Sequence, residues 1–264
     1  MATKNEKRYA LITGATSGIG YELAKLFAKD GYNIVAVSRT MDDLDRIAEE
    51  FSQQYGVEVV SIVKDLFNSD AAMELYEEIK GRNLTVDVLV NDAGQGQYGL
   101  FIENDIQRQL DIIQLNIASL TAITYYFLKD MVARNEGKIL QLASIASESP
   151  GPYQAEYHAT KAYVLSFSQA LAEELRNSGV TVTALCPGPT ATEFASSANV
   201  GKSGLFAAFG IAHAEDVAKF GVAAMMHGKR VAIPGIKNKI VAQASRITPR
   251  AVSTRITRMA QESR

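Results

Sequence analysis

The chain contains a tyrosine, a lysine and a serine whose spacing suits proton exchange with a carbonyl or alcohol oxygen. Tyr157 and Lys161 are four residues apart, so in a helix their side chains lie on one face. A free phenol has a pKa of about 10, and we expect the ammonium of Lys161 to lower it. Tyr157 would then act as general acid or base near neutral pH. Ser144, thirteen residues before Tyr157, would hydrogen-bond and position the substrate oxygen.

The Tyr-x-x-x-Lys spacing alone is weak evidence, because it occurs three times in the chain. Tyr76/Lys80 and Tyr125/Lys129 repeat it, but neither pair has a serine thirteen residues upstream. We therefore interpret these two pairs as ordinary helix residues. For the third pair two plainer interpretations stay open, namely a tyrosine of the core and a serine that caps a helix.

A glycine-rich turn lies near the N-terminus, after an apolar run and before a helical pattern. Its glycines permit a tight turn, and the free N–H groups at the helix start favour an anion. In this position the turn predicts a nucleotide site, although an ordinary glycine-rich connection would look alike. The residues expected to hold the phosphates are Gly14, Thr16, Ser17, Gly18, Ile19 and Gly20.

The end of the next strand indicates which nicotinamide nucleotide fits. An acidic residue about twenty positions past the glycines would bind the ribose 2′-hydroxyl of NAD. Here Ser38 and Arg39 stand at the strand end, and Arg39 can bind a 2′-phosphate through charge-assisted hydrogen bonds. Asp42 and Asp43 follow, but they suit the first turn of the next helix. The sequence thus favours NADP(H) over NAD(H), with an ordinary surface charge as the alternative for Arg39.

These motifs together resemble the short-chain dehydrogenase/reductase family. The turn has that family's Thr-Gly-x-x-x-Gly-x-Gly spacing, and Asn116, Ser144, Tyr157 and Lys161 match its catalytic tetrad. The resemblance covers roughly residues 8–235 and implies a nicotinamide-dependent oxidoreductase. It also implies that Asn116 anchors a water linking Lys161 to solvent; a packing role is the alternative. Further cofactor contacts implied by it are Asp65, Leu66, Asn91, Ala93, Gly94, Tyr157, Lys161, Pro187, Gly188 and Thr190.

Asp92 is a departure from the resemblance, because the family has a second asparagine at this position. Asp is nearly isosteric with Asn. We therefore expect a slight effect on the sheet and none on catalysis.

Continuous apolar strands alternate with helical patterns along most of the chain, which predicts a parallel sheet covered on both faces. We expect an α/β Rossmann-type doubly wound sheet of about seven strands, with residues 1–264 forming a single domain. The expected strands cover residues 9–13, 33–38, 57–63, 86–90, 138–142, 180–186 and 231–234. Helices are expected at 41–55, 71–79 and 154–178, and residues 103–135 contain no Pro or Gly.

The helix predicted within residues 103–135 is apolar on more than one face, so it needs two partners. One is the sheet, and the other is a second subunit or the chain's own tail. We expect a homodimer or a homotetramer.

Two segments in the last third of the chain are expected to shape the substrate site. Residues 189–213, rich in Gly, Ala and Ser, suit a lid over an apolar substrate, with Phe194 in contact; a short packed helix pair is the alternative. Ser144, Tyr153 and Tyr157 complete the expected substrate contacts. The tail, residues 236–264, has seven basic residues and one acidic residue. It is expected to dock on its own protein more readily than on an anionic membrane.

Bulk composition excludes several functions. A net charge of −2 gives no electrostatic reason for a nucleic-acid partner. Cys186 is the only cysteine, so no intrachain disulfide can form, and the three histidines show no metal-ligand spacing. With no secretory signal or apolar run of membrane-spanning length, we expect a soluble cytoplasmic protein.

The expected activity is hydride transfer between NADP(H) and a carbonyl or secondary alcohol, with a bulky apolar ketone as substrate. A non-catalytic NADP(H) sensor is the alternative, although a sensor needs the glycine turn and not the four tetrad residues.

Overall fold

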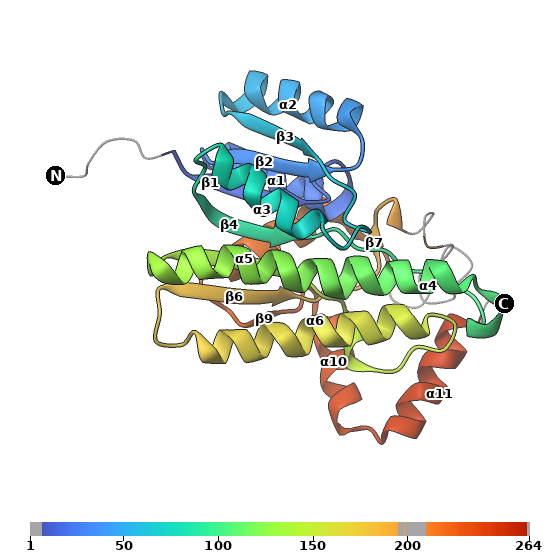
Figure 1. Cartoon of the computed structure of the whole chain (residues 1–264). Helices are drawn as coiled ribbons and strands as arrows, with labels where there is room; N and C mark the ends of the chain where they lie inside the picture. Colours follow the sequence, from blue (N-terminus) through green and yellow to red (C-terminus); the bar gives the residue numbers. More distant parts are fainter. Residues whose placement is uncertain (1–6, 195–197, 199–209, 263–264) are drawn as a thin grey trace.

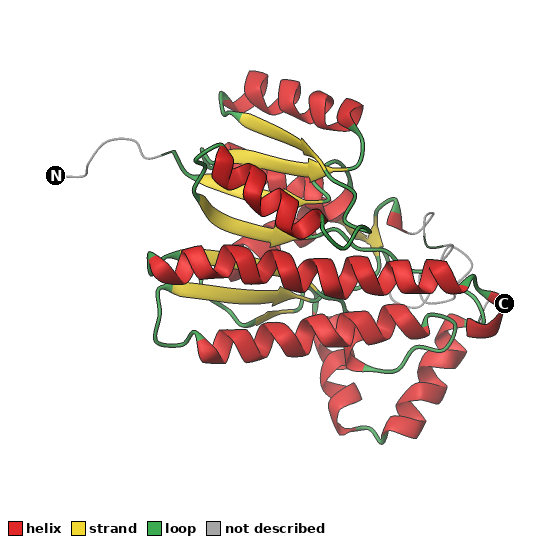
Figure 2. Ribbon diagram, viewed as in Figure 1, coloured by secondary structure: helices red, strands yellow, loops and turns green. Residues whose placement is uncertain are grey.

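A computed structural model of the chain describes residues 7–194, 198 and 210–262. Seven strands form one parallel sheet in the order β3-β2-β1-β4-β5-β6-β9 (Figures 1 and 2). The order reverses between β1 and β4, and in such sheets ligands bind at the carboxyl ends beside this point. The strands are β1 (Tyr9–Thr13), β2 (Asn33–Ser38), β3 (Val59–Val63), β4 (Val86–Asn91), β5 (Gly137–Leu142), β6 (Val180–Leu185) and β9 (Val231–Ala232).

Helices cover both faces of this sheet, as predicted for a Rossmann-type fold. The strands are mostly apolar because alternate side chains enter different cores: Ala10 and Ile12 belong to one cluster and Leu11 to the other. The first core involves α1 (Gly18–Lys29), α2 (Met41–Tyr55) and α9 (Ala214–Met226). The second involves α3 (Ala71–Gly81), α5 (Leu120–Ala133) and α6 (Ala155–Glu174).

The long helical segment is less regular than the sequence predicts. It begins with α4 (Ile106–Ile113), capped by Asp105, whose carboxylate accepts a hydrogen bond from the Arg108 amide at 2.8 Å. A π-helical turn, η2 (Gln114–Ser119), then separates α4 from α5. Such turns often occur at functional sites, and this one carries Asn116.

Of the predicted lid, the two ends and residue 198 lie within the described residues. β7 (Thr190–Ala191) pairs in parallel with β8 (Ala212–His213), so a two-stranded ladder, which the sequence did not indicate, joins these ends. Residues 195–197 and 199–209 lie outside the described part.

The basic tail forms two helices, α10 (Ile236–Ile247) and α11 (Arg250–Gln261), which project from the body beside α6 (Figure 1). α10 packs against η3 (Ile145–Glu148), where Arg246 pairs with Glu148 at 3.0 Å. The tail therefore docks on its own protein through one face. Within the described ranges, no helix has the length and apolar character needed to cross a bilayer.

Candidate active site

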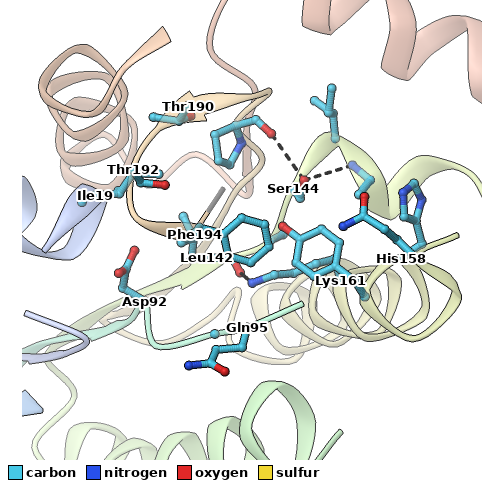
Figure 3. A pocket seen from close by; sticks show the side chains of 18 of the residues that line it. Ile19, Asp92, Gln95, Leu142, Ser144, His158, Lys161, Thr190, Thr192 and Phe194 are labelled. Atoms are coloured by element: carbon cyan, nitrogen blue, oxygen red, sulfur yellow. Dashed lines mark hydrogen bonds between the residues drawn. The ribbon is translucent and has the colours of Figure 1, made fainter. Parts of the chain in front are cut away.

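A cavity of about 590 Å³ lies at the carboxyl ends of the central strands. Figure 3 shows Ile19 and Asp92 on one side of it and Ser144, Lys161 and Phe194 on the other. The predicted site residues that line it are Gly14, Thr16, Ser17, Gly18, Ile19, Ser38, Arg39, Asp65, Leu66, Ala93, Gly94, Ser144, Tyr157, Lys161, Pro187, Gly188, Thr190 and Phe194.

The glycine turn has the backbone that an anion site requires. Gly14 and Gly18 have φ angles of 73° and 57°, in the left-handed region that favours glycine. A Cβ on Gly20 would lie 2.2 Å from the carbonyl oxygen of Gly14, so a side chain cannot be placed there without moving the turn. Ser17 is the N-cap of α1, and its side chain makes no capping hydrogen bond. The first N–H groups of α1 thus face the cavity, where a pyrophosphate fits.

The end of β2 presents a cation and no carboxylate to the same cavity. Arg39 is exposed there, with its guanidinium carbon 5.7 Å from the ring centroid of Phe67. Asp43 is engaged elsewhere, because the Thr40 hydroxyl donates a hydrogen bond to it at the start of α2. Arg46, which the sequence did not single out, donates to the carbonyl of Thr16 in the turn at 3.0 Å. This donor set fits a nucleotide with a ribose 2′-phosphate.

The three central side chains meet at the inner end of the cavity. Tyr157 and Lys161 lie one turn apart on α6, with the Lys161 Nζ 5.8 Å from the Tyr157 ring centroid. Lys161 donates to the carbonyl of Leu142 at 2.6 Å. Ser144 follows β5, hydrogen-bonds Tyr157 and also caps η3 by accepting from the Ala146 amide at 3.1 Å. Ser144 therefore caps a short helix, as one interpretation of the sequence expects, and also lies beside Tyr157, as the catalytic interpretation expects.

The pKa values of this pair differ from the expectation. Desolvation raises the pKa of Tyr157 to about 12, opposed by its hydrogen bond with Ser144, and burial lowers the pKa of Lys161 to about 8. Lys161 does not lower the phenol's pKa, because Lys161 loses its proton near pH 8, before the phenol titrates. The chain itself therefore keeps Tyr157 protonated, which suits a proton donor.

Asp92 lines the cavity and acts on both of these groups. It accepts a hydrogen bond from the Gly20 amide, while its buried Oδ1 has no partner in the described part of the chain. Burial raises the pKa of Asp92 to about 7, and the charge of Lys161 opposes this. Its negative charge in turn raises the pKa values of Tyr157 and Lys161. The expectation that Asp92 leaves catalysis unaffected stays a prediction, and the pH profile of Asp92→Asn described below tests it.

Asn116 is buried beside the cavity and does not line it. Its Oδ1 accepts from the Gln95 amide at 2.9 Å, and its Nδ2 donates to the Gln95 carbonyl at 2.8 Å and to Thr160 Oγ1 at 3.0 Å. These bonds tie the loop after β4 to α6, as the packing interpretation expects. A Cβ on Gly94 would lie 3.3 Å from both Asn116 Oδ1 and Lys161 Nζ, so the amide is close to the lysine. The water relay stays a prediction.

Two further residues assigned to the cofactor lie outside the cavity lining. Asn91 belongs to the sheet, where its Nδ2 donates to Thr124 Oγ1 and Gln141 Oε1, both at 3.0 Å. Gly20 lies behind the turn, where its amide donates a hydrogen bond to Asp92. Asn91 and Gly20 therefore hold the neighbouring strands and the turn in place and do not border the cavity themselves.

Tyr153 does not line the cavity, contrary to the expected substrate contact. Its hydroxyl donates to Glu262 at 2.9 Å, and its ring stacks on Tyr98 with 5.7 Å between centroids. The Tyr98 hydroxyl donates to the Gln261 carbonyl at 2.7 Å. Tyr153 lies before the start of α6 and has a φ of 69°, in the left-handed region. It therefore fastens the end of α11.

His158, next to Tyr157, takes part in the same attachment. Its Nδ1 lies 2.7 Å from the Ser149 carbonyl and its Nε2 lies 2.8 Å from the Gln261 amide nitrogen. Burial lowers the pKa of His158, so it is neutral, donating to Ser149 and accepting from Gln261. Both ring nitrogens of His158 are thus engaged in holding the end of α11.

The outer wall of the cavity comes from the tail, which sequence reasoning did not place there. Small and apolar residues of α10 and α11 form it: Val241, Ala244, Ser245, Thr248, Ser253, Ile256, Thr257 and Ala260. Their spacing of three and four residues was a usable signal, because it marks one face of each helix.

Comparisons with known proteins agree with this geometry. The model of the family described as short chain dehydrogenase matches residues 8–203. The very-long-chain 3-oxoacyl-CoA reductase of Bos taurus is 36% identical over 196 residues, which are 71% of this chain and 61% of that protein. The match thus spans about three fifths of that relative's length.

Two solved structures resemble the whole fold. A short-chain dehydrogenase from Sphingobium yanoikuyae in complex with NADPH has a TM-score of 0.82 and 27% identity, covering 91% of this chain and 94% of that one. The bulky-bulky ketone specific alcohol dehydrogenase from Comamonas testosteroni has a TM-score of 0.78 and 26% identity, covering 92% and 93%.

Proposed function

Because the chain belongs to the short-chain dehydrogenase/reductase family, we propose that it is an NADP(H)-dependent reductase of bulky apolar ketones. One observation carries the proposal: Ser144, Tyr157 and Lys161 line the same cavity as the glycine turn and Arg39. A nucleotide bound along the turn would therefore extend toward the tyrosine.

The chain's own residues would handle the substrate oxygen and its proton. Bound NADPH would supply the hydride to the carbonyl carbon. Ser144 would hold the carbonyl oxygen, and Tyr157 would give that oxygen its proton, so that ketone, hydride and proton form the alcohol. Lys161 would place a positive charge beside the phenolate that remains. Phe194, whose ring centroid is 5.1 Å from that of Tyr157, would help exclude water.

The preference for NADP(H) and for a large substrate has separate support. Arg39 offers a guanidinium where a 2′-phosphate would lie, and the Sphingobium yanoikuyae structure contains NADPH. The tail lines the outer cavity with residues such as Val241, Ala244 and Ile256, which suit an apolar chain or ring system. The names of the Bos taurus and Comamonas testosteroni proteins point to the same substrate class.

We also propose a homodimer or homotetramer formed through α5 and α6. The tail lies beside η3, and Tyr125, Val132 and Tyr163 remain exposed on these two helices. A second subunit is thus the better candidate for the second partner of the long helical segment.

Asp92→Asn is expected to move the pH dependence of reduction to lower pH. Without the carboxylate the pKa of Tyr157 falls, so the alkaline limb of kcat/KM, which reports loss of the tyrosine's proton, moves down. Stability should change as well. A carboxyl whose pKa is raised to about 7 stabilises the fold most below its ordinary value of 3.8, and this contribution is lost as the pH rises to about 7.

The difference between wild type and Asp92→Asn in Tm should therefore depend on pH within that window and level off above it. Asp87→Asn is the matched control, because Asp87 is half-buried with a raised pKa at the other end of β4. It should leave the activity profile unchanged. An unshifted alkaline limb in Asp92→Asn would contradict the role given to this carboxylate.

Tyr153→Phe is expected to weaken ketone binding without affecting the nucleotide. The change removes the hydrogen bond to Glu262 and loosens the end of α11, which forms the outer wall. Because this hydrogen bond lies near the protein surface, its loss should loosen the wall without unfolding it, and KM should rise about two- to fivefold. Steady-state kinetics measure KM for the ketone, and a titration measures the affinity for NADPH. An equal change in these two quantities would contradict a role of Tyr153 limited to the substrate.

Fluorescence titration with NADPH and NADH, followed by oxidation assays against ketones of increasing chain length and bulk, tests the proposal. We expect tighter NADPH binding and turnover that improves with apolar bulk. Binding without turnover on any ketone would favour the sensor.

A further inference from the structure

The face of α10 that points away from the protein body is apolar. Ile236, Ile240 and Ile247 follow one another at intervals of four and seven residues, so they form one stripe along the helix. All three are exposed, and Ile247 retains 80% of its accessible surface. The buried Ala242 and the cavity-lining Val241 and Ser245 lie on the other side of the helix. Docking of the tail thus uses one face of α10 and leaves an isoleucine stripe uncovered in the chain as described.

α11 repeats this division. Val252, Ile256 and Met259 are spaced by four and three residues and are exposed, Met259 by 75%. The opposite face holds the buried Ser253 and Gln261. Ile256 belongs to both surfaces, because it lines the cavity and is also exposed. The apolar stripe of α11 therefore reaches the mouth of the cavity.

A second exposed apolar segment adjoins the end of α11. Leu100, Phe101 and Ile102 lie around η1 (Phe101–Glu103), and Ile102 is 89% exposed. The neighbouring Tyr98 holds the Gln261 carbonyl at 2.7 Å, which fixes this segment beside the chain's C-terminal end (Figure 1). Isolated exposed apolar residues are ordinary, whereas a gathered set indicates an interaction surface.

The charges around this surface indicate its partner. Residues 236–264 have a formal charge of +6, against −2 for the whole chain, so all other residues together carry −8. Lys237, Lys239, Arg250 and Arg255 are exposed on α10 and α11 beside the apolar stripes. Exposed aliphatic side chains flanked by lysine and arginine are typical of helices that lie in the interface of an anionic bilayer.

A second copy of the chain suits this surface less well. A two-fold symmetric contact would bring the same basic surface of both copies together. Their like charges would oppose association, whereas anionic headgroups would neutralise them.

We propose that the outer face of α10 and α11, together with residues 100–102, binds the surface of an anionic lipid bilayer. The cavity mouth beside Ile256 would then face the lipid, and an apolar substrate could pass between the two. The binding itself does not depend on the proposed reaction, so its test uses no activity measurement.

Co-sedimentation of the full chain with lipid vesicles tests this proposal. One set contains phosphatidylcholine alone and the other about 30% phosphatidylserine. We expect at least about tenfold stronger binding to the anionic vesicles at low salt, reduced as the salt concentration rises. Equal binding to both sets, or no binding to either, would overturn the proposal.

Matched variants locate the surface. Ile247→Glu and Met259→Glu should each weaken vesicle binding at least about fivefold, because a carboxylate enters the apolar stripe. Met73→Glu is the control, since Met73 is a 43% exposed methionine on α3, outside the proposed surface. Tm and NADPH affinity check that each variant is folded. Retained vesicle binding in both tail variants would overturn the assignment. A second result would also overturn it: the wild type binds no vesicles and forms an oligomer, and these variants dissociate that oligomer. The surface would then be a subunit contact.

Discussion

Tyr157→Phe is expected to lower kcat for ketone reduction by about 10²–10⁴-fold, the usual contribution of a positioned general acid. The change removes only the hydroxyl that would donate the proton. The ring, which packs with its centroid 5.1 Å from that of Phe194, stays in place. Affinity for NADPH should therefore change by no more than about twofold. Initial rates of NADPH oxidation and a fluorescence titration measure the two quantities separately.

Tyr125→Phe provides a control of the same chemistry. Tyr125 also precedes a lysine by four residues, but it lies exposed on α5, away from the cavity lining. It should retain wild-type turnover. If Tyr157→Phe kept its activity, the proton would have to come from another group and the proposed mechanism would be wrong.

Arg39→Ala is expected to weaken NADPH binding by about 10- to 100-fold with little effect on NADH. Hydrogen bonds to a charged group contribute about 1.5–3 kcal/mol, and each 1.4 kcal/mol changes the affinity tenfold. Arg39 stands at the carboxyl end of β2 and lines the cavity, whereas Asp43 is bonded to Thr40. Parallel titrations with NADPH and NADH give the ratio directly.

Arg176→Ala is the control for the loss of a positive charge, because Arg176 is exposed and pairs with Glu173 after α6. Its NADPH affinity should equal that of wild type. An unchanged NADPH affinity in Arg39→Ala, or a wild-type preference for NADH, would remove the basis for assigning NADP(H).

The fold was predictable because its signals are local. Each strand of the sheet is an apolar run, and each connecting helix has its own periodicity, so the strands β1 and β2 agree with the structure at both ends. β3 begins at Val59, two residues later than predicted, because residues 57 and 58 connect to α2 without pairing in the ladder. The π-helical turn at Asn116 leaves no comparable trace, since its residues are helical formers like their neighbours.

The parts of the site that the sequence did not reveal depend on contacts between distant segments. The ammonium of Lys161 was expected to lower the phenol's pKa, but segments distant in the sequence bury Lys161 and lower its own pKa to about 8, so its charge is lost before the phenol titrates. Asp92 can carry a charge that asparagine lacks, and burial near Lys161 raises the pKa of this carboxyl to about 7. Tyr153 looked like a substrate residue from its distance along the chain, yet Glu262 is its partner. None of these contacts could be predicted from the spacing of its residues in the sequence.

Deuteride transfer tests the central claim most directly. The protein is incubated with NADPH deuterated at C4 of the nicotinamide and with a bulky apolar ketone, and the product is analysed by mass spectrometry. We predict that the alcohol carries one deuterium on its carbinol carbon, and that only one of the two C4 positions of the nicotinamide supplies it. In Tyr157→Phe the amount of labelled alcohol should fall strongly. Tight NADPH binding with no labelled alcohol from any ketone would contradict a reductase and leave a nucleotide-binding protein without this chemistry.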